Sequence, residues 1–167
     1  NKCRSTLTSY SRSSGRLHVR SWFVCLKTCI IGESWDEATV IERGDAKLHI
    51  AGIDDPHYYQ VDNLEKAAMH IPPDEVSILL SHSPEVYKRA AHSDFNLMLC
   101  GHTHGGQICL PRGIFVTVNA NCPRLMAKGA WDYHDMRGYT SVGCGSCIVD
   151  ARINCLPEVT LHHLRKE

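Results

Sequence analysis

The sequence contains no uninterrupted apolar run of the roughly 18 residues that a helix needs to cross a lipid bilayer. Its longest candidate, WFVCLKTCII at residues 22–31, is too short and contains Lys27. An excess of charge of one sign is missing as well, because 18 Lys and Arg residues balance 18 Asp and Glu residues. A chain without net charge gives no electrostatic reason to expect nucleic acid or an anionic membrane as a partner. We therefore expect no nucleic-acid partner.

Dense, regular cysteine spacing is also absent, and the number of cysteines, nine, is odd. Mostly reduced thiols in a reducing compartment are the simplest interpretation. The chain begins with Asn1 instead of methionine, so we expect it to be a fragment whose upstream part carries any signal or anchor. The predicted localisation is therefore cytoplasmic or membrane-associated, with membrane attachment only through the missing N-terminus.

After residue 37 the sequence alternates between strand and helix patterns. Residues 1–37 include STLTSYSRSSGR, which has neither the period of a strand nor that of a helix, so a loop or disorder is expected there. Residues 38–167 have the pattern of an α/β domain. The expected elements are a β-hairpin turning at residues 43–45, a turn at Asp54–Asp55, a helix over 62–70 with Asp62 as N-cap, a strand over 76–81, a short helix over 84–92, a strand over 95–100, and further short strands over 113–120, 138–143 and 158–164.

Two of the apolar runs end in histidine. His82 follows the strand pattern at 76–81 and His102 follows that at 95–100, with a helix pattern between them. Such a unit normally forms parallel strands whose carboxyl ends lie at the same edge of the sheet. His104 can point to the same side as His102 in an extended turn. Three imidazoles beside glycines suit a transition metal such as Zn, Mn or Fe, and ordinary buried or surface histidines are the alternative.

The segments LLSHSPE and LCGHTHGGQI resemble the C-terminal half of calcineurin-like metallophosphoesterases, in particular the bacterial phosphohydrolases whose last metal motif reads GHTHGGQ. The resemblance runs from about residue 38 to residue 164. It implies that residues 38–167 are the C-terminal part of a four-layer α/β/β/α sandwich with two divalent metal ions, Mn, Zn or Fe. The implied ligands of one ion are His82 and His102, the implied ligand of the other is His104, and the residues implied on the substrate side are Gly105, Gly106 and Gln107.

The same resemblance implies an activity. Such enzymes hydrolyse phosphomono- or phosphodiesters, and the implied substrate is a small-molecule or lipid-linked phosphate ester. Of the family's other motifs, G-D-x-x-D and G-N-H do not occur before His82, and no D-x-H precedes the Gly-Asp pair at residues 44–45. These motifs supply the bridging carboxylate and the catalytic histidine. We therefore expect the catalytic residues to lie upstream and this chain to be impaired in catalysis.

Two other interpretations stay open. One is a non-catalytic remnant that binds metal. The other is a zinc-stabilised binding module, because Cys144 and Cys147 have the spacing of a zinc-ligand pair, with Cys155 and His162 or His163 downstream. A single pair of this kind is also compatible with reduced structural cysteines.

Overall fold

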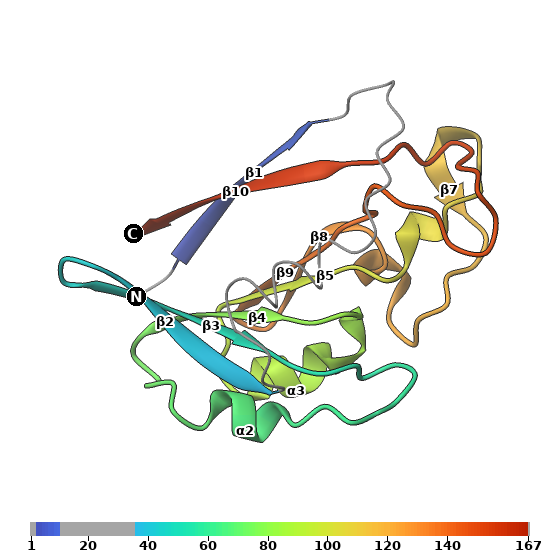
Figure 1. Cartoon of the computed structure of the whole chain (residues 1–167). Coiled ribbons are helices and arrows are strands. Elements are labelled where there is room, and N and C mark those ends of the chain that lie inside the picture. Colours follow the sequence, from blue (N-terminus) through green and yellow to red (C-terminus); the bar gives the residue numbers. More distant parts are fainter. Residues whose placement is uncertain (1–2, 11–35, 167) are drawn as a thin grey trace.

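The structure, a computed structural model shown in Figure 1, describes the backbone of residues 3–10 and 36–166 and the side chains of residues 36–165. Its main feature is a six-stranded sheet with parallel strands at the centre and an antiparallel strand at each edge. In spatial order the strands are β2 (Glu37–Arg43), β3 (Ala46–Gly52), β4 (Val76–Leu80), β5 (Leu97–Cys100), β9 (Met136–Thr140) and β8 (Gly129–Tyr133).

Short helices connect the parallel strands. α2 (Leu64–Ala68) lies between β3 and β4, and η1 (Pro84–Val86) continues into α3 (Tyr87–His92) between β4 and β5. Figure 1 shows α2 and α3 on one side of the sheet, and the antiparallel ladder of β1 (Cys3–Tyr10) and β10 (Val159–Lys166) on the other. The short elements that follow β5 are η2 (His104–Gly106), β6 (Cys109–Leu110), η3 (Pro111–Gly113), β7 (Ile114–Phe115) and η4 (Arg124–Met126).

Apolar side chains of the central strands alternate between the two faces of the sheet, as the period of a strand requires. On the face toward the helices, Ala51, Leu79 and Met98 are fully buried and belong to the main core together with Leu64 of α2. Because both faces are buried, LMLC is a continuous apolar run and VSILL is interrupted only by the buried Ser77, so neither strand alternates between apolar and polar residues. The cluster on the second face consists of Ile50, Ile78, Leu80 and Leu97.

The sequence predictions are confirmed for the centre of the fold. The chain is α/β, the hairpin turns at Gly44 with a φ of 58°, and β4 and β5 are parallel neighbours. The cap of α2 differs by one residue from the prediction, because the Asn63 side chain accepts a hydrogen bond from the backbone N–H of Lys66 at 2.9 Å. Asp62, the predicted N-cap, instead forms an ion pair with Arg89.

Other segments differ more. The strand predicted at residues 113–120 is limited to β7, because the Arg124 guanidinium donates to the carbonyls of Phe115 and Val116 at 2.6 and 3.2 Å. Within residues 1–37, where a loop or disorder was expected, the structure has β1 and the first residue of β2. Residues 1–2 and 11–35 lie outside the described residues, so the expectation stays a prediction there. The four-layer sandwich also stays a prediction.

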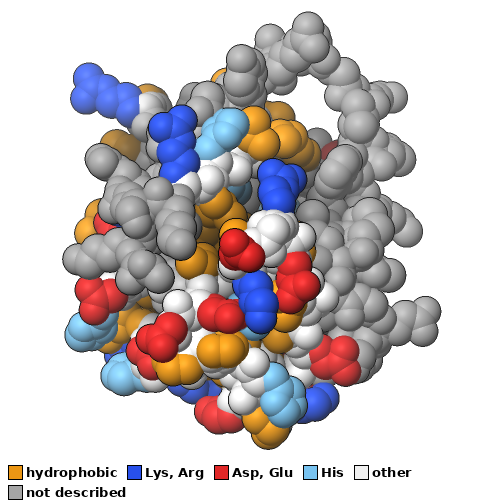
Figure 2. All heavy atoms as spheres, turned by 90° about the vertical axis from the view of Figure 1, so that its left-hand side faces the viewer, with side chains coloured by type: hydrophobic (Ala, Val, Ile, Leu, Met, Phe, Trp, Pro, Cys, Tyr) orange, Lys and Arg blue, Asp and Glu red, His pale blue; other side chains and the backbone are white. Residues whose placement is uncertain are grey.

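On the face shown in Figure 2, acidic, basic and histidine side chains are interspersed with apolar ones. This mixture agrees with the equal numbers of acidic and basic residues in the sequence. Within the part of the chain that the structure describes, no helix is long and apolar enough to cross a membrane.

Leu79 provides a test of the fold, because it is fully buried in the central strand β4. We expect Leu79→Ala to lower the free energy of unfolding by about 2–5 kcal/mol, through lost burial and the cavity left behind. Chemical denaturation measures the change. Leu125→Ala is the matched control, since Leu125 is 85% exposed, and a similar loss in both variants would contradict the described core.

Candidate functional site

The candidate site lies at the carboxyl ends of β4 and β5. The parallel pairing continues past both strands, because the N–H of Ser81 donates to the Leu99 carbonyl at 3.0 Å and the N–H of Gly101 donates to the His82 carbonyl at 3.1 Å. These bonds hold the two strand ends side by side. The rings of His82 and His102 consequently lie 4.7 Å apart between centroids, so the structure brings together two of the predicted metal ligands.

His104, the third predicted ligand, lies in the tight turn after β5. His102 and His104 both have positive φ angles, 68° and 50°, and the Thr103 hydroxyl between them donates to the Ala127 carbonyl at 2.7 Å. The Nδ1 atom of His104 is 3.4 Å from the guanidinium of Arg152. Arg152 also donates to the carbonyls of Val142, Gly145 and Cys155, so it ties this turn to the loop that follows β9.

The two glycines after His104 have no room for side chains. A Cβ on Gly105 would lie 2.5 Å from Cγ1 of Val142, and one on Gly106 would lie 2.3 Å from Cβ of Phe115. Gly105 also has a φ of 61°, a conformation that favours glycine. The glycines therefore let the turn pack closely against its neighbours, and their predicted place on the substrate side stays a prediction.

Gln107, the third residue predicted on the substrate side, is buried at 8% exposure. Its amide nitrogen donates to the carbonyls of Cys147 and Val149 at 3.0 and 2.7 Å, and its amide oxygen accepts from the N–H of Cys147 at 2.7 Å. These three bonds make Gln107 the anchor of the loop at residues 144–150. A contact with substrate stays a prediction for this residue.

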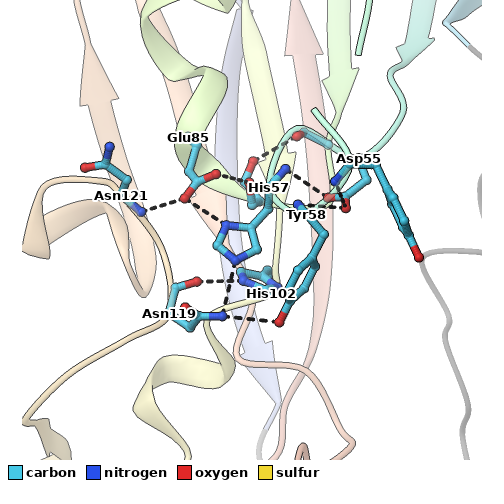
Figure 3. Close-up of polar contacts among 10 residues, drawn as sticks. Asp55, His57, Tyr58, Glu85, His102, Asn119 and Asn121 are labelled. Atoms are coloured by element: carbon cyan, nitrogen blue, oxygen red, sulfur yellow. Dashed lines mark hydrogen bonds and ion pairs between the residues drawn. The ribbon is translucent and has the colours of Figure 1, made fainter. Parts of the chain in front are cut away.

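Sequence reasoning missed four residues that surround His102. Figure 3 shows His57 and Tyr58 from the loop after β3, Glu85 from the start of η1, and Asn119 from the loop before η4. The His57 ring lies 4.3 Å from that of His102, and Nδ1 of His57 lies 3.0 Å from the Glu85 carboxylate. The histidine group therefore contains an additional ring and an acidic partner.

One sequence signal could have drawn attention to this loop, because residues 55–57 read Asp-Pro-His, a D-x-H spacing. The structure gives the Asp55 carboxylate a local role, since it accepts hydrogen bonds from the backbone N–H groups of His57, Tyr58 and Tyr59 at 3.0–3.3 Å. This confirms the predicted turn. The geometry thus separates the two residues: Asp55 shapes the loop, and His57 faces the other histidines.

Electrostatics in the group favour neutral imidazoles. Desolvation is the main cause that lowers the pKa of His82, His102 and His104, and the proximity of another basic group adds to it: the His102 ring for His82, the His57 ring for His102, and the Arg152 guanidinium for His104. A neutral imidazole has a free lone pair, which is the form that binds a metal ion.

The donor set suits a transition-metal ion in its chemistry, because imidazole nitrogen is a common ligand of Zn, Mn and Fe. The positions of these side chains, however, do not form a complete metal site. In the described part of the chain, no three His, Cys, Asp or Glu side chains converge as a group that could hold a metal. Nε2 of His102 donates to the Asn119 carbonyl at 2.6 Å, so the ring offers only its Nδ1 atom.

The alternative cysteine site is not assembled either among the described residues. Cys144 and Cys147 are exposed, and the Cys144 thiol donates to the Glu158 carbonyl at 3.1 Å. Cys155 is buried in a small cluster with Cys109 and Val142. Of the two histidines in β10, His162 is partly buried and His163 is exposed, as expected for neighbours in a strand.

Comparison with known proteins gives relatives that are mostly named as phosphodiesterases or metallophosphoesterases. The phosphodiesterase YaeI of Escherichia coli is 30% identical over 139 residues, which are 83% of this chain and 49% of the relative. The uncharacterized metallophosphoesterase YkoQ of Bacillus subtilis is 29% identical over 130 residues, 77% of the chain and 47% of the relative. A transmembrane protein with metallophosphoesterase domain from Bos taurus is 40% identical over 105 residues, 54% of the chain and 23% of the relative.

These relatives support the metallophosphoesterase superfamily for this chain. The chain spans about half the length of YaeI and YkoQ. No family model matches the chain, and no solved structure matches it significantly. At the level of the superfamily, metallophosphoesterases act on phosphoester bonds with divalent metal ions. The superfamily assignment therefore agrees with the chemistry of the histidine group.

The lowered histidine pKa values predict how stability depends on pH. These desolvated rings bind protons less readily in the folded chain than in the unfolded chain. Above about pH 6.5 the rings are neutral in both states, and as the pH falls below this value protonation increasingly favours the unfolded chain. We expect the free energy of unfolding to decrease from about pH 7.5 to about pH 5.5. Denaturant titrations at several pH values measure this slope.

The double variant His82→Gln/His104→Gln should have a shallower slope, because two of the contributing rings are removed. His70→Gln is the control, since His70 is exposed just after α2. An unchanged slope in the double variant would show that these rings do not couple to folding.

Proposed function

We propose that the chain is part of an enzyme that hydrolyses phosphomono- or phosphodiesters with the help of divalent metal ions. The observation that carries this proposal is the adjacency of His82 and His102 at the carboxyl ends of neighbouring parallel strands. This edge is where α/β sheets place their ligands. The names of the relatives, phosphodiesterase and metallophosphoesterase, supply the reaction class.

In this proposal His82, His102 and His104 hold Mn, Zn or Fe ions, two of them in the complete site. A bound ion supplies an activated water and neutralises charge on the phosphoryl oxygens. The residues of the chain keep the imidazoles neutral by desolvation and hold the turn that carries His104 against Arg152. The proposed substrate is a small-molecule or lipid-linked phosphate ester.

The described residues supply imidazoles but no carboxylate that converges with them on a metal. Two adjacent cations without a bridging carboxylate repel each other strongly, so this chain alone is proposed to be a weak catalyst. The complete protein would supply the remaining ligands.

Metal content tests the ligands. We expect the chain, loaded with Zn²⁺ and freed of excess ion, to retain metal by elemental analysis, and His82→Ala to retain much less, because an imidazole ligand is lost. Cys144→Ala is the control and should retain as much metal as the unaltered chain. Metal that is lost in Cys144→Ala and kept in His82→Ala would instead support the zinc-stabilised binding module.

Hydrolysis of bis(4-nitrophenyl) phosphate in the presence of Mn²⁺ tests the reaction. We expect slow turnover that a chelator abolishes, because the ion activates the attacking water. His102→Ala should abolish the same turnover, whereas the exposed His163→Ala should keep it. Turnover that persists with the chelator, or in His102→Ala, would contradict the proposed function.

A further inference from the structure

Glu85 connects three segments that are distant in the sequence. Its Oε1 atom accepts hydrogen bonds from Nδ1 of His57 at 3.0 Å and from the backbone N–H of Asn121 at 2.6 Å. The side chains of Glu85 and His57 are each only 16% exposed. Glu85 therefore holds the loop after β3 and the loop before η4 against the start of η1, as Figure 3 shows.

The hydrogen bonds around Glu85 are compatible with one neutral tautomer of His57. The carboxylate can only accept, so Nδ1 of His57 carries the proton and Nε2 has the lone pair. This lone pair faces the amide nitrogen of Asn119 at 3.2 Å, which is a donor. In both hydrogen bonds of the His57 ring, a donor thus faces an acceptor.

Asn119 extends the same pattern to His102. The backbone carbonyl of Asn119 is an acceptor, and it lies 2.6 Å from Nε2 of His102. The proton of His102 is consequently on Nε2, and the lone pair is on Nδ1. Asn119 thus contacts both rings, through its side chain at His57 and through its backbone at His102.

We propose that Glu85 is a positioning residue that, through His57 and the loop at residues 119–121, fixes the Nε2–H tautomer of His102 and so makes Nδ1 its ligand atom for a divalent transition-metal ion. The metal part rests on the proposed function, whereas the tautomer is a property of the chain itself. Carboxylates that orient a ligating histidine typically change metal affinity by about 10- to 100-fold when they are removed.

Glu75 offers a matched control at the other end of the sheet. It forms a pair with Nε2 of His49 in β3, and it lies immediately before β4, at the ends of the parallel strands that are opposite to the site. Glu75→Gln therefore alters a similar His–Glu hydrogen bond without touching the His102 network. A general effect of losing such a pair would appear in both variants.

The affinity of the chain for Zn²⁺, measured by competition with a chromophoric chelator, is the first test. We expect Glu85→Gln to bind Zn²⁺ about 10- to 100-fold more weakly, because the amide loses the charge and part of the acceptor capacity. Glu75→Gln should keep the affinity, even if thermal unfolding shows a similar loss of stability in both. Unchanged affinity in Glu85→Gln would overturn the role in metal binding.

Nitrogen NMR of the histidine side chains in the metal-free chain is the second test, because protonated and unprotonated ring nitrogens have different chemical shifts. We expect a single Nε2–H form for His102 in the unaltered chain and in Glu75→Gln, and a tautomer mixture in Glu85→Gln. An Nδ1–H form in the unaltered chain would overturn the inference.

The two tests separate this inference from the proposed function. A chain that binds no Zn²⁺ but shows the expected tautomers would refute the metal site and leave the positioning role of Glu85 intact. A chain that binds Zn²⁺ through His82 but keeps the same His102 tautomer in Glu85→Gln would support the function and refute the inference.

Discussion

The parallel pairing of β4 with β5 is the constraint on which the site depends. Leu79 opposite Met98 sets the register, and both are fully buried, so a slip by one residue would exchange side chains between the two buried faces of the sheet and disrupt the packing of both clusters. The same register places the strand ends side by side and continues as backbone hydrogen bonds up to His82 and Gly101. The positions of the first two histidines thus follow from core packing as much as from local sequence.

The loops around this edge add a second level of organisation. Each loop is held by hydrogen bonds between a side chain and the backbone. The side chains are Asp55 after β3, Thr103 and Arg152 at the histidine turn, and Gln107 at the loop of residues 144–150. Glu85 then joins the loop after β3 to the loop before η4. Such polar contacts hold imidazoles in place and partly out of water, which lowers their pKa and keeps them neutral.

Much of the fold could be predicted, because the buried strands and the first helices follow short-range patterns. The hairpin at Gly44, β4, α3 and β5 follow from periodicity and turn residues alone. The errors lie where a distant side chain competes with local preference. Asp62 is a residue type that is favoured at the N-cap, but it forms an ion pair with Arg89 instead. The strand predicted beyond Phe115 does not form, and the carbonyls of Phe115 and Val116 accept hydrogen bonds from Arg124.

The sequence by itself determined that His82 and His102 meet, because a strand, helix, strand unit has one usual handedness and places its carboxyl ends together. Only the tertiary structure decided which residues surround them. His57 and Asn119 are 62 positions apart in the chain, and His57 and Glu85 are 28 apart, so no local pattern links them. Their contacts depend on loops whose paths are set by packing and individual hydrogen bonds, and this is why the ring nitrogen that His102 offers could be inferred only from the folded molecule.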